Sequence, residues 1–156
     1  MIVDDLFEVF YGTNLELNKL EKSNSGINFV SRTEENNGVS AIVKPIDNLP
    51  PLDAGLITVA GGGNSVLSSF VQIKPFYSGR DLFYLKSRKL MSLREKLFYC
   101  MCIRKNQFKY SYGRQANRTL KTITLPSPIP SWVFSKELVQ PIKEKIKTAL
   151  WIYIIG

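Results

Sequence analysis

The sequence predicts a mixed α/β fold of the α+β class, with a twisted, mostly antiparallel sheet, one main amphipathic helix and a short C-terminal helical tail. Two observations support this prediction. Up to residue 85, runs of β-branched and aromatic residues alternate with turns that contain Gly, Pro or Asn-Gly, as expected for paired strands. From residue 90, apolar residues recur every three or four positions, which is typical of a helix.

The strand signals follow one another with short connections. Residues 6–12 have strand composition and end at Gly12, whereas residues 13–23 fit either a helix or a turn. The remaining strand signals are 27–30 and 39–43 around the turn Asn37-Gly38, a pair around Gly61–Gly63, 82–85, and a strand-like piece at 122–125. Strands joined by such short turns pair as antiparallel neighbours.

Residues 90–104 carry the clearest helix signal in the chain. The apolar residues that recur there at helical spacing are Leu90, Leu93, Leu97 and Met101. Charged residues lie between them, so the predicted helix is amphipathic.

The proline cluster at 126–130 predicts the end of the folded unit, because proline is poorly tolerated inside strands and helices. We therefore expect one domain over residues 1–130 and a tail over residues 131–156. The tail has helix-like composition from Ser135, and Pro141 would interrupt a single helix there.

Composition and charge narrow the class of partner. A length of 156 residues with 44% hydrophobic residues suits one globular domain with a substantial core. Lys and Arg number 21 against 13 Asp and Glu, which gives a formal charge of +8 and favours nucleic acid first and an anionic membrane second. With no apolar run of about eighteen residues and no basic, apolar leader, the chain is expected to be cytoplasmic.

The residue types argue against an enzyme. Histidine is absent, which removes the commonest general base and the usual activator of Ser or Cys nucleophiles. Cys100 and Cys102 have no further thiols or imidazoles with which to form a common zinc site, so we expect reduced core residues, no metal and no cofactor. The neighbouring carboxylates suit a solvated surface beside polar or turn residues: Asp4, Asp5, Glu34 and Glu35.

The stretch "KNQFKYSYGRQANRTL", residues 105–120, interleaves cations with aromatics around one glycine. If residues 108–112 are extended, their aromatic side chains share one face and pack inward, while Lys109 meets solvent on the other. Gly113 then permits a sharp turn before Arg114, Gln115, Asn117 and Arg118. Arginine can read guanine, and Asn or Gln can read adenine, although an amphipathic strand with a merely basic exterior remains an alternative.

Two further loops have a similar polar composition, and loops are the usual carriers of binding residues. The first loop, "SRTEENNG", contains Arg32, Thr33, Asn36 and Asn37, and the second, "PFYSGRD", contains Tyr77, Ser78 and Arg80. The glycine run "AGGGNS" invites a phosphate-loop interpretation, but it lacks the lysine and hydroxyl of that motif, and a turn between two strands is favoured. Close approach to a DNA backbone is a third interpretation.

Several stretches together, and in order, resemble a known family. They are "FEVFYGTNLEL", "INFVSRTEENNGV", "GLITVAGGGNSVLSSFVQIKPFYSGRD" and "LFYCMCIRKNQFKYSYGRQANRTLKTITLPSP". Over about residues 5–134 the chain resembles the target recognition domain of DNA specificity (S) subunits from type I restriction-modification systems, and of related fused type II enzymes.

The resemblance implies a recognition domain that contacts one half of a bipartite DNA site and delivers the adjoining adenine to a methyltransferase subunit, without catalytic residues of its own. A restriction subunit is a further implied partner. The DNA-binding residues expected from the loops and the resemblance are Arg32, Asn36, Asn37, Tyr77, Arg80, Lys109, Tyr112, Arg114, Asn117 and Arg118. In "SYGRQANRTL", the Tyr, Gly and Asn residues could instead build the fold, with only the arginines on DNA.

Several alternatives remain open. Complete S subunits resemble two such domains separated by long helices, whereas this chain corresponds to one domain. It could support a working enzyme as a half-subunit that pairs with itself, serve as a spare specificity module, or support no enzyme at all. The second hypothesis is an assembly module in which the helix at 90–104 and the apolar tail form the functional surface, without specific DNA reading. A nuclease or phosphodiesterase ranks third.

Overall fold

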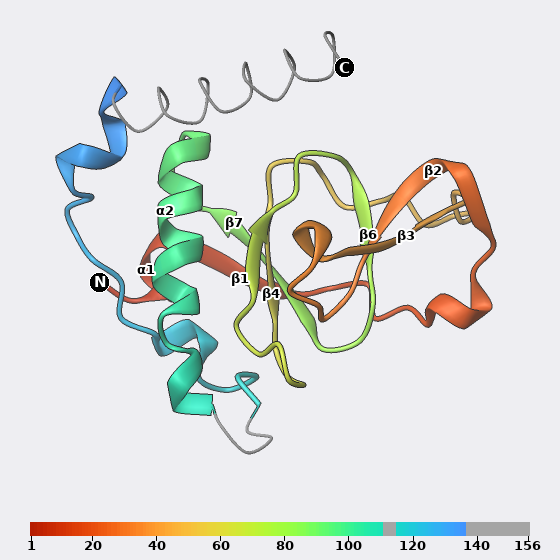
Figure 1. Ribbon diagram of the computed structural model, residues 1–156, viewed down its shortest axis with the longest axis horizontal. Helices are drawn as coiled ribbons and strands as arrows, with labels where there is room; N and C mark the ends of the chain where they lie inside the picture. Colours follow the sequence, from red (N-terminus) through yellow and green to blue (C-terminus); the bar gives the residue numbers. More distant parts are fainter. Residues whose placement is uncertain (111–114, 137–156) are drawn as a thin grey trace, which may run out of the picture. The chain divides into compact units, whose positions relative to one another are not determined.

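The structure, a computed structural model, describes residues 1–110 and 115–136 and confirms the α+β class (Figure 1). Its strands form two sheets, one of four strands and one of three. The helices and strands, in chain order, are α1 (Val3–Leu6), β1 (Phe7–Tyr11), β2 (Lys22–Val30), β3 (Val39–Val43), β4 (Ile57–Ala60), β5 (Ser69–Val71), β6 (Phe76–Ser78), β7 (Leu82–Ser87) and α2 (Leu93–Arg104).

The four-stranded sheet has the order β1-β7-β4-β5, and each neighbouring pair is antiparallel. Its central strand β4 consists of apolar and β-branched residues, and all four are buried. On the outer strand, Phe10 lies opposite Tyr84 in the register, and their rings stack with centroids 5.0 Å apart. The strand pair predicted around the glycine run is confirmed as the β4 and β5 hairpin.

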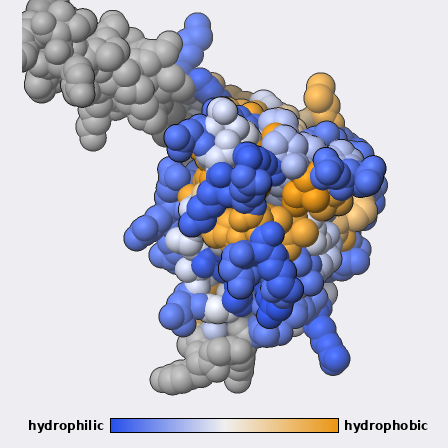
Figure 2. All heavy atoms as spheres, turned by 90° about the vertical axis from the view of Figure 1, so that its right-hand side faces the viewer, coloured by the Kyte–Doolittle hydropathy of each residue, from blue (hydrophilic) through white to orange (hydrophobic). Residues whose placement is uncertain are grey.

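The three-stranded sheet has the order β3-β2-β6. The predicted strand, turn, strand signal is confirmed by the antiparallel pairing of β2 with β3, whereas β6 pairs with β2 in parallel. A core cluster of Phe29, Val43 and Tyr77 holds this sheet, with partly buried leucines and isoleucines packed around it. Figure 2 shows the face at this end of the molecule, where hydrophobic surface lies between hydrophilic residues.

Helix α2 begins where the sequence provides a capping box. The Ser92 side chain accepts a hydrogen bond from the Glu95 backbone N–H (3.3 Å), and the Glu95 carboxylate accepts one from the Ser92 N–H (2.6 Å). The predicted helix is therefore confirmed, although it starts at Leu93 and not at residue 90. It lies beside the four-stranded sheet, on the side away from β2 and β3 (Figure 1).

The buried face of α2 consists of Phe98, Tyr99, Cys100 and Ile103. Tyr99 meets the ring of Phe7 edge-on at 5.7 Å, which fastens the helix to β1. Both cysteines are free, and burial raises the pKa of the Cys100 thiol to about 12. The expected core role is confirmed for Cys100, which is buried, whereas Cys102 is half-buried.

The segment after α2 differs from its sequence-based expectation. Residues Gln107–Tyr110 form a short 3-10 helix, not an extended strand, because the chain keeps turning after α2 through the Lys109 N–H to Asn106 carbonyl bond. Phe108 is consequently 74% exposed, so the prediction that it packs inward is wrong. The strand-like piece at 122–125 contributes only a single antiparallel bridge, between Thr124 and Ile2.

The chain divides into two compact units, residues 1–126 and 127–156. The boundary after residue 130 stays a prediction, and the predicted helical tail lies largely outside the described residues. In the second unit, Ser131–Phe134 forms a 3-10 helix. No helix within the described ranges is long and apolar enough to cross a membrane.

Candidate nucleic-acid interface

The glycine run forms the centre of a cluster that three other segments approach. The N–H of Gly61 donates to the Asp81 carbonyl (2.7 Å), and the Gly61 carbonyl accepts from the Ala116 N–H (2.8 Å). A β-carbon at Gly61 would lie 2.6 Å from the Phe83 ring and 2.9 Å from the Asn117 side-chain oxygen. This close approach explains why the chain requires glycine there, and it brings the segment after residue 114 onto the loop.

Arg32, from the loop that follows β2, lies over the same glycine run. Its guanidinium is within about the same distance of both glycines, 3.6 Å from the position of a β-carbon at Gly62 and 3.5 Å from that at Gly63. One of its nitrogens donates to the Asp81 carboxylate at 3.0 Å. Gly63 has a φ of +77°, a backbone conformation in which a residue with a β-carbon would be strained, so glycine is favoured at this position as well.

Asp81 orients Arg32 and is itself held in place. Its backbone has a φ of +52°, and its N–H donates to the Tyr11 hydroxyl oxygen at 2.9 Å. The Tyr11 hydroxyl in turn donates to the Asp81 carboxylate at 3.2 Å. The pair remains accessible to a ligand, because the Arg32 and Asp81 side chains are 36% and 29% exposed.

Gln115 and Asn117 form the polar rim beside Arg32. The Asn117 amide donates to the Gln115 side-chain oxygen at 2.9 Å, and both residues are exposed. Between them, Ala116 is fully buried and bonds to Gly61, so the two amides project from a fixed backbone. An amide presents a donor and an acceptor side by side, which matches the adenine edge in the major groove, while an arginine matches guanine.

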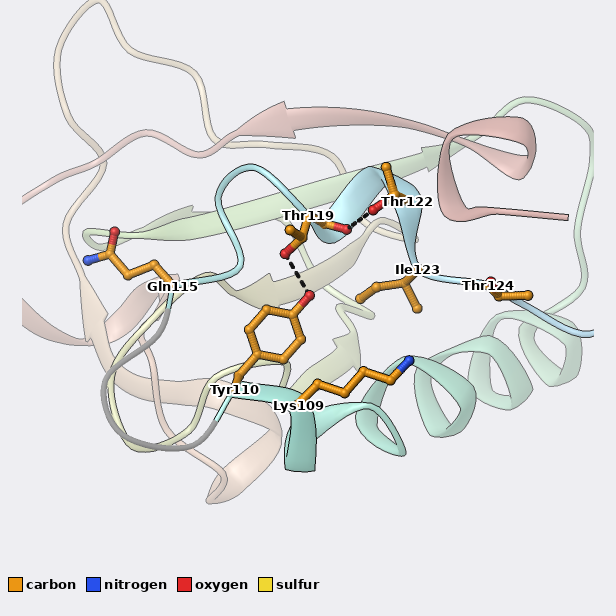
Figure 3. Close-up of a pocket in the computed structure, with 7 residues that line it drawn as sticks. All are labelled: Lys109, Tyr110, Gln115, Thr119, Thr122, Ile123 and Thr124. Carbon is orange, nitrogen blue, oxygen red and sulfur yellow. Dashed lines mark hydrogen bonds between the residues drawn. The ribbon is translucent and has the colours of Figure 1, made fainter.

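An open pocket of about 500 Å³ lies next to this rim, lined by Lys109, Tyr110, Gln115, Thr119, Thr122, Ile123 and Thr124 (Figure 3). Tyr110 lies between Gln115 and Lys109 in this view, and its hydroxyl bonds to the Thr119 hydroxyl at 2.6 Å. Lys109 is exposed and lies 5.7 Å from the Phe108 ring centroid. A cation among hydroxyl groups can contact a phosphate.

Other predicted contact residues serve the fold. The amide of Asn36 donates to the Val39 carbonyl (3.1 Å), and that of Asn37 to the Val71 carbonyl (3.0 Å), within a turn of positive φ. Tyr77 is fully buried, and its hydroxyl bonds to the Leu49 carbonyl and the Ile46 N–H. Its assignment as a DNA contact is corrected to a core role, since a buried ring cannot reach a nucleic acid.

Arg80 is exposed but already paired. It donates to the Glu16 carboxylate at 2.5 Å, and Lys19 bonds to the same carboxylate at 3.0 Å. Lys19 and Arg80 together hold the pKa of Glu16 below its ordinary value. Arg118 is exposed beside Asn117, whereas Tyr112 and Arg114 lie outside the described residues.

Sequence reasoning missed the orienting residues. Asp81 directly follows the predicted Arg80, but nothing local links it to Arg32, which is 49 positions away. Tyr11 falls within the strand signal at residues 6–12 and carries no local sign of a role at this site. A turn signal at Asp81 was present in "SGRD", yet its role depends on long-range pairing.

Two of these loops are also fastened to the end of α2. The Gln107 amide donates to the Val66 carbonyl at 3.0 Å and approaches the Glu34 carboxylate at 3.4 Å. Glu34 belongs to the same loop as Arg32, and its carboxylate also accepts from the Ser68 hydroxyl at 3.3 Å. Two loops of the first unit are therefore tied to one helix end: the loop of Arg32 and Glu34, and the loop between β4 and β5. Within residues 1–110 and 115–136, no group of three or more His, Cys, Asp or Glu side chains is arranged to hold a metal ion.

The chain is similar in sequence to the specificity subunit S.BcgI of a type II restriction enzyme from Heyndrickxia coagulans. The two are 26% identical over 148 residues, which cover 90% of this chain and 42% of that subunit. No protein family model matches the chain. The resemblance stated from the sequence motifs is thus confirmed at the sequence level by a curated protein.

Solved structures show the same likeness in fold. The S subunit of a type I restriction-modification system from M. genitalium matches with a TM-score of 0.58 and 12% identity, over 80% of this chain and 32% of that one. A structure from a study of assembly and conformational transition of the type I system matches with a TM-score of 0.65 and 12% identity, over 97% and 39%. The chain therefore spans about two fifths of these proteins or less. The relative of known sequence is a specificity subunit, the class of protein that the sequence motifs resemble.

Proposed function

We propose that this chain reads double-stranded DNA as a target recognition domain, in a specificity subunit or half-subunit that directs a restriction-modification methyltransferase or nuclease to its site. The observation that carries the proposal is the convergence of Arg32, Gln115 and Asn117 around the glycine run. These side chains come from segments far apart in the sequence, and all three have the chemistry of base readers.

In this proposal, Arg32 reads a guanine and the amides of Gln115 and Asn117 read a neighbouring adenine. The absence of a side chain at Gly62 and Gly63 would let a DNA strand approach the backbone closely. Lys109, Arg114 and Arg118 would contact phosphates and set the orientation of the domain on the duplex. Tyr112 remains a candidate contact. Arg80, like Arg32, is paired with a carboxylate, and either arginine would share or leave that partner on binding DNA.

The partners are inferred from the relatives. A methyltransferase subunit is the expected partner, a restriction subunit is a further one, and a cytoplasmic location follows from that role. We also propose a homodimer, in which pairing of two copies would supply a second half-site. The net charge of +8 supports the polyanionic partner independently of any relative.

The first test is selection of bound sequences from a randomised duplex pool at two salt concentrations, followed by sequencing. The proposal predicts enrichment of one short motif, and an affinity that falls with a log–log salt slope of about 0.9 per neutralised phosphate. Salt-sensitive binding without enrichment would mean that the chain holds DNA but does not read it. Absence of binding would contradict the proposal and favour the assembly hypothesis.

Arg32→Ala makes the test specific to the cluster. We expect a loss of about 1–3 kcal/mol for the selected site and relaxed preference at one base position, because a bidentate guanine contact would be lost. Arg88→Ala is the matched control. It also removes one paired arginine, but Arg88 contacts Asp4 and Glu8 at the opposite end of β7 from Asp81. Equal losses of DNA affinity in both variants would mean that Arg32 contributes only its charge and does not read a base.

A further inference from the structure

Helix α2 turns an apolar stripe to solvent. Leu93, Leu97 and Met101 are 53%, 47% and 53% exposed, although each is separated from the next by one helical turn and could have formed a buried face. The residues that pack inward are instead the larger aromatic and branched side chains of the opposite face. Leu90, just before the helix, is also fully exposed.

The stripe has the spacing of a helical recognition face. At about 1.5 Å per residue, Leu93 to Met101 spans about 12 Å along the helix axis, which corresponds to anchors at i, i+4 and i+8. Single exposed leucines need no explanation, but a row of them on one helix face marks a site of contact with another protein. Methionine within such a face adapts to the shape of its partner.

The charges on this face have one sign. At 3.6 residues per turn, the cations that share the outward face with the stripe are Arg94, Arg104 and Lys105. Arg104 borders this face, because its guanidinium lies over the Phe70 ring of β5, 4.6 Å from the ring centroid. Glu95 is the only carboxylate in α2, and it is engaged in the capping box with Ser92.

We propose that the outward face of α2 is the docking surface for a helix of a partner protein that carries apolar anchors flanked by Asp or Glu. Charge complementarity selects this occupant. A second copy would bring the same cations face to face. The segment after residue 136 is also a poor match, because its lysines outnumber its carboxylates: Lys143, Lys145 and Lys147 against Glu137 and Glu144.

Gln107 connects this surface to the loops that carry Glu34 and Val66. It follows α2 directly and bonds to Val66 and Glu34, so a partner held on α2 would be fixed relative to the loop that carries Arg32. The docking surface does not use the DNA-reading side chains. The inference therefore goes beyond the proposed function and can succeed or fail separately from it.

Oxidation of methionine tests whether the surface is open. In the full chain, Met101 should be converted to the sulfoxide by dilute hydrogen peroxide about as fast as Met1, since the two are 53% and 55% exposed. Peptide mass spectrometry measures both rates. Protection of Met101 that persists on dilution would mean that the chain covers its own stripe, and protection lost on dilution would mean a second copy. Either result would overturn the proposal.

Binding of synthetic peptides tests the chemistry of the occupant. Two amphipathic helical peptides, about four turns long, would carry the same leucine stripe with glutamates or with lysines on its flanks. Fluorescence anisotropy with the full chain should give an affinity at least about tenfold higher for the glutamate-flanked peptide, which should also slow oxidation of Met101. Equal affinities, or no binding of either peptide, would contradict the proposal.

Variants locate the binding. The triple change L93Q/L97Q/M101Q should weaken the glutamate-flanked peptide at least about tenfold, whereas Ile73→Gln, at a 71% exposed apolar residue outside α2, should not. The selected DNA site should bind the triple variant as well as the parent chain. An equal loss of peptide affinity in the triple variant and in Ile73→Gln would overturn the inference. So would a parent chain that binds phosphatidylserine vesicles and not the peptide, if the triple change abolishes the vesicle binding. Failure of DNA binding in the parent chain would contradict only the proposed function.

Discussion

The turn between β2 and β3 and the segment after residue 114 have similar polar composition and use it in opposite ways. In the turn, the amides of Asn36 and Asn37 bond to backbone carbonyls of neighbouring strands. In the later segment, the amides of Gln115 and Asn117 bond to each other and stay exposed. The same residue type therefore closes a loop in one region and forms a polar rim in the other.

The difference has a backbone origin. Asn36 and Asn37 adopt positive φ values of 46° and 56°, a conformation that asparagine tolerates and that directs its amide back to the chain. In the later segment, buried Ala116 makes the backbone contact with Gly61, which leaves its neighbours free to project outward. Polar composition thus identifies loops, but the direction of each side chain depends on which residue anchors the loop.

The largest effect that would sharpen this comparison is expected at Tyr77. Tyr77→Ala should lower the free energy of unfolding by about 3–5 kcal/mol, because a fully buried ring is removed from the core of the three-stranded sheet. Tyr77→Phe keeps the ring but loses the hydroxyl bonded to Leu49 and Ile46, and should cost about 1–3 kcal/mol. Urea unfolding measures both. A stable Tyr77→Ala variant with lost DNA affinity would break the comparison and restore Tyr77 as a contact.

A reciprocal pair of changes tests the comparison directly. Asn37→Ala should lower the free energy of unfolding by about 2 kcal/mol, because alanine is strained at positive φ and the bond to Val71 is lost, with base preference unchanged. Asn117→Ala should cost less than about 0.5 kcal/mol of stability and about 1–3 kcal/mol of discrimination at one base. Thermal unfolding and binding to single-base variants of the selected site separate the two effects. The reverse pattern would exchange the roles of the two regions.

Local signals in the sequence account for most elements of the fold. The hairpin of β2 and β3 follows from β-branched runs around Asn37-Gly38, and α2 follows from its periodicity and the Ser92 cap. The division into two sheets does not follow, because the parallel pairing of β6 with β2 joins residues about 48 positions apart. The periodic leucines predicted the helix but not its buried face. That face is determined by contacts with residues distant in sequence, such as the contact of Tyr99 with Phe7.

The sequence predicts which residue types form the candidate site, but not which of these residues come together in the fold. Arg32 and Asn117 were expected on loop chemistry, but their meeting at the glycine run depends on the 61–116 backbone bond and on Asp81, both products of tertiary structure. Asn36, Asn37 and Tyr77 had equally suitable chemistry and were taken up by internal hydrogen bonds. Only packing distinguishes these two outcomes.

Arg80 combines features of the two regions, because its side chain is exposed but paired with Glu16. Glu16→Gln should free the Arg80 side chain to contact DNA. Loss of the carboxylate would release Arg80, raise the affinity for DNA modestly, and steepen the log–log salt slope of binding by about 0.9 if Arg80 gains one phosphate contact. Glu21→Gln is the matched control, because it causes the same change in net charge but releases Lys44. Equal effects of the two variants would mean that net charge alone is responsible.

The pH dependence of binding provides an independent check on Arg80. Its pair with Glu16 requires an ionised carboxylate, and Lys19 and Arg80 hold the pKa of Glu16 below its ordinary value. The folded state therefore favours the ionised form, and the stabilising pair is complete above the ordinary carboxyl pKa and is lost only as the pH falls through the lowered value. Between pH 8 and pH 5, DNA binding by the parent chain should show no gain from released Arg80, and the difference from Glu16→Gln should stay constant. A difference that disappears already at pH 5 would mean that the pair is too weak to keep Arg80 from DNA.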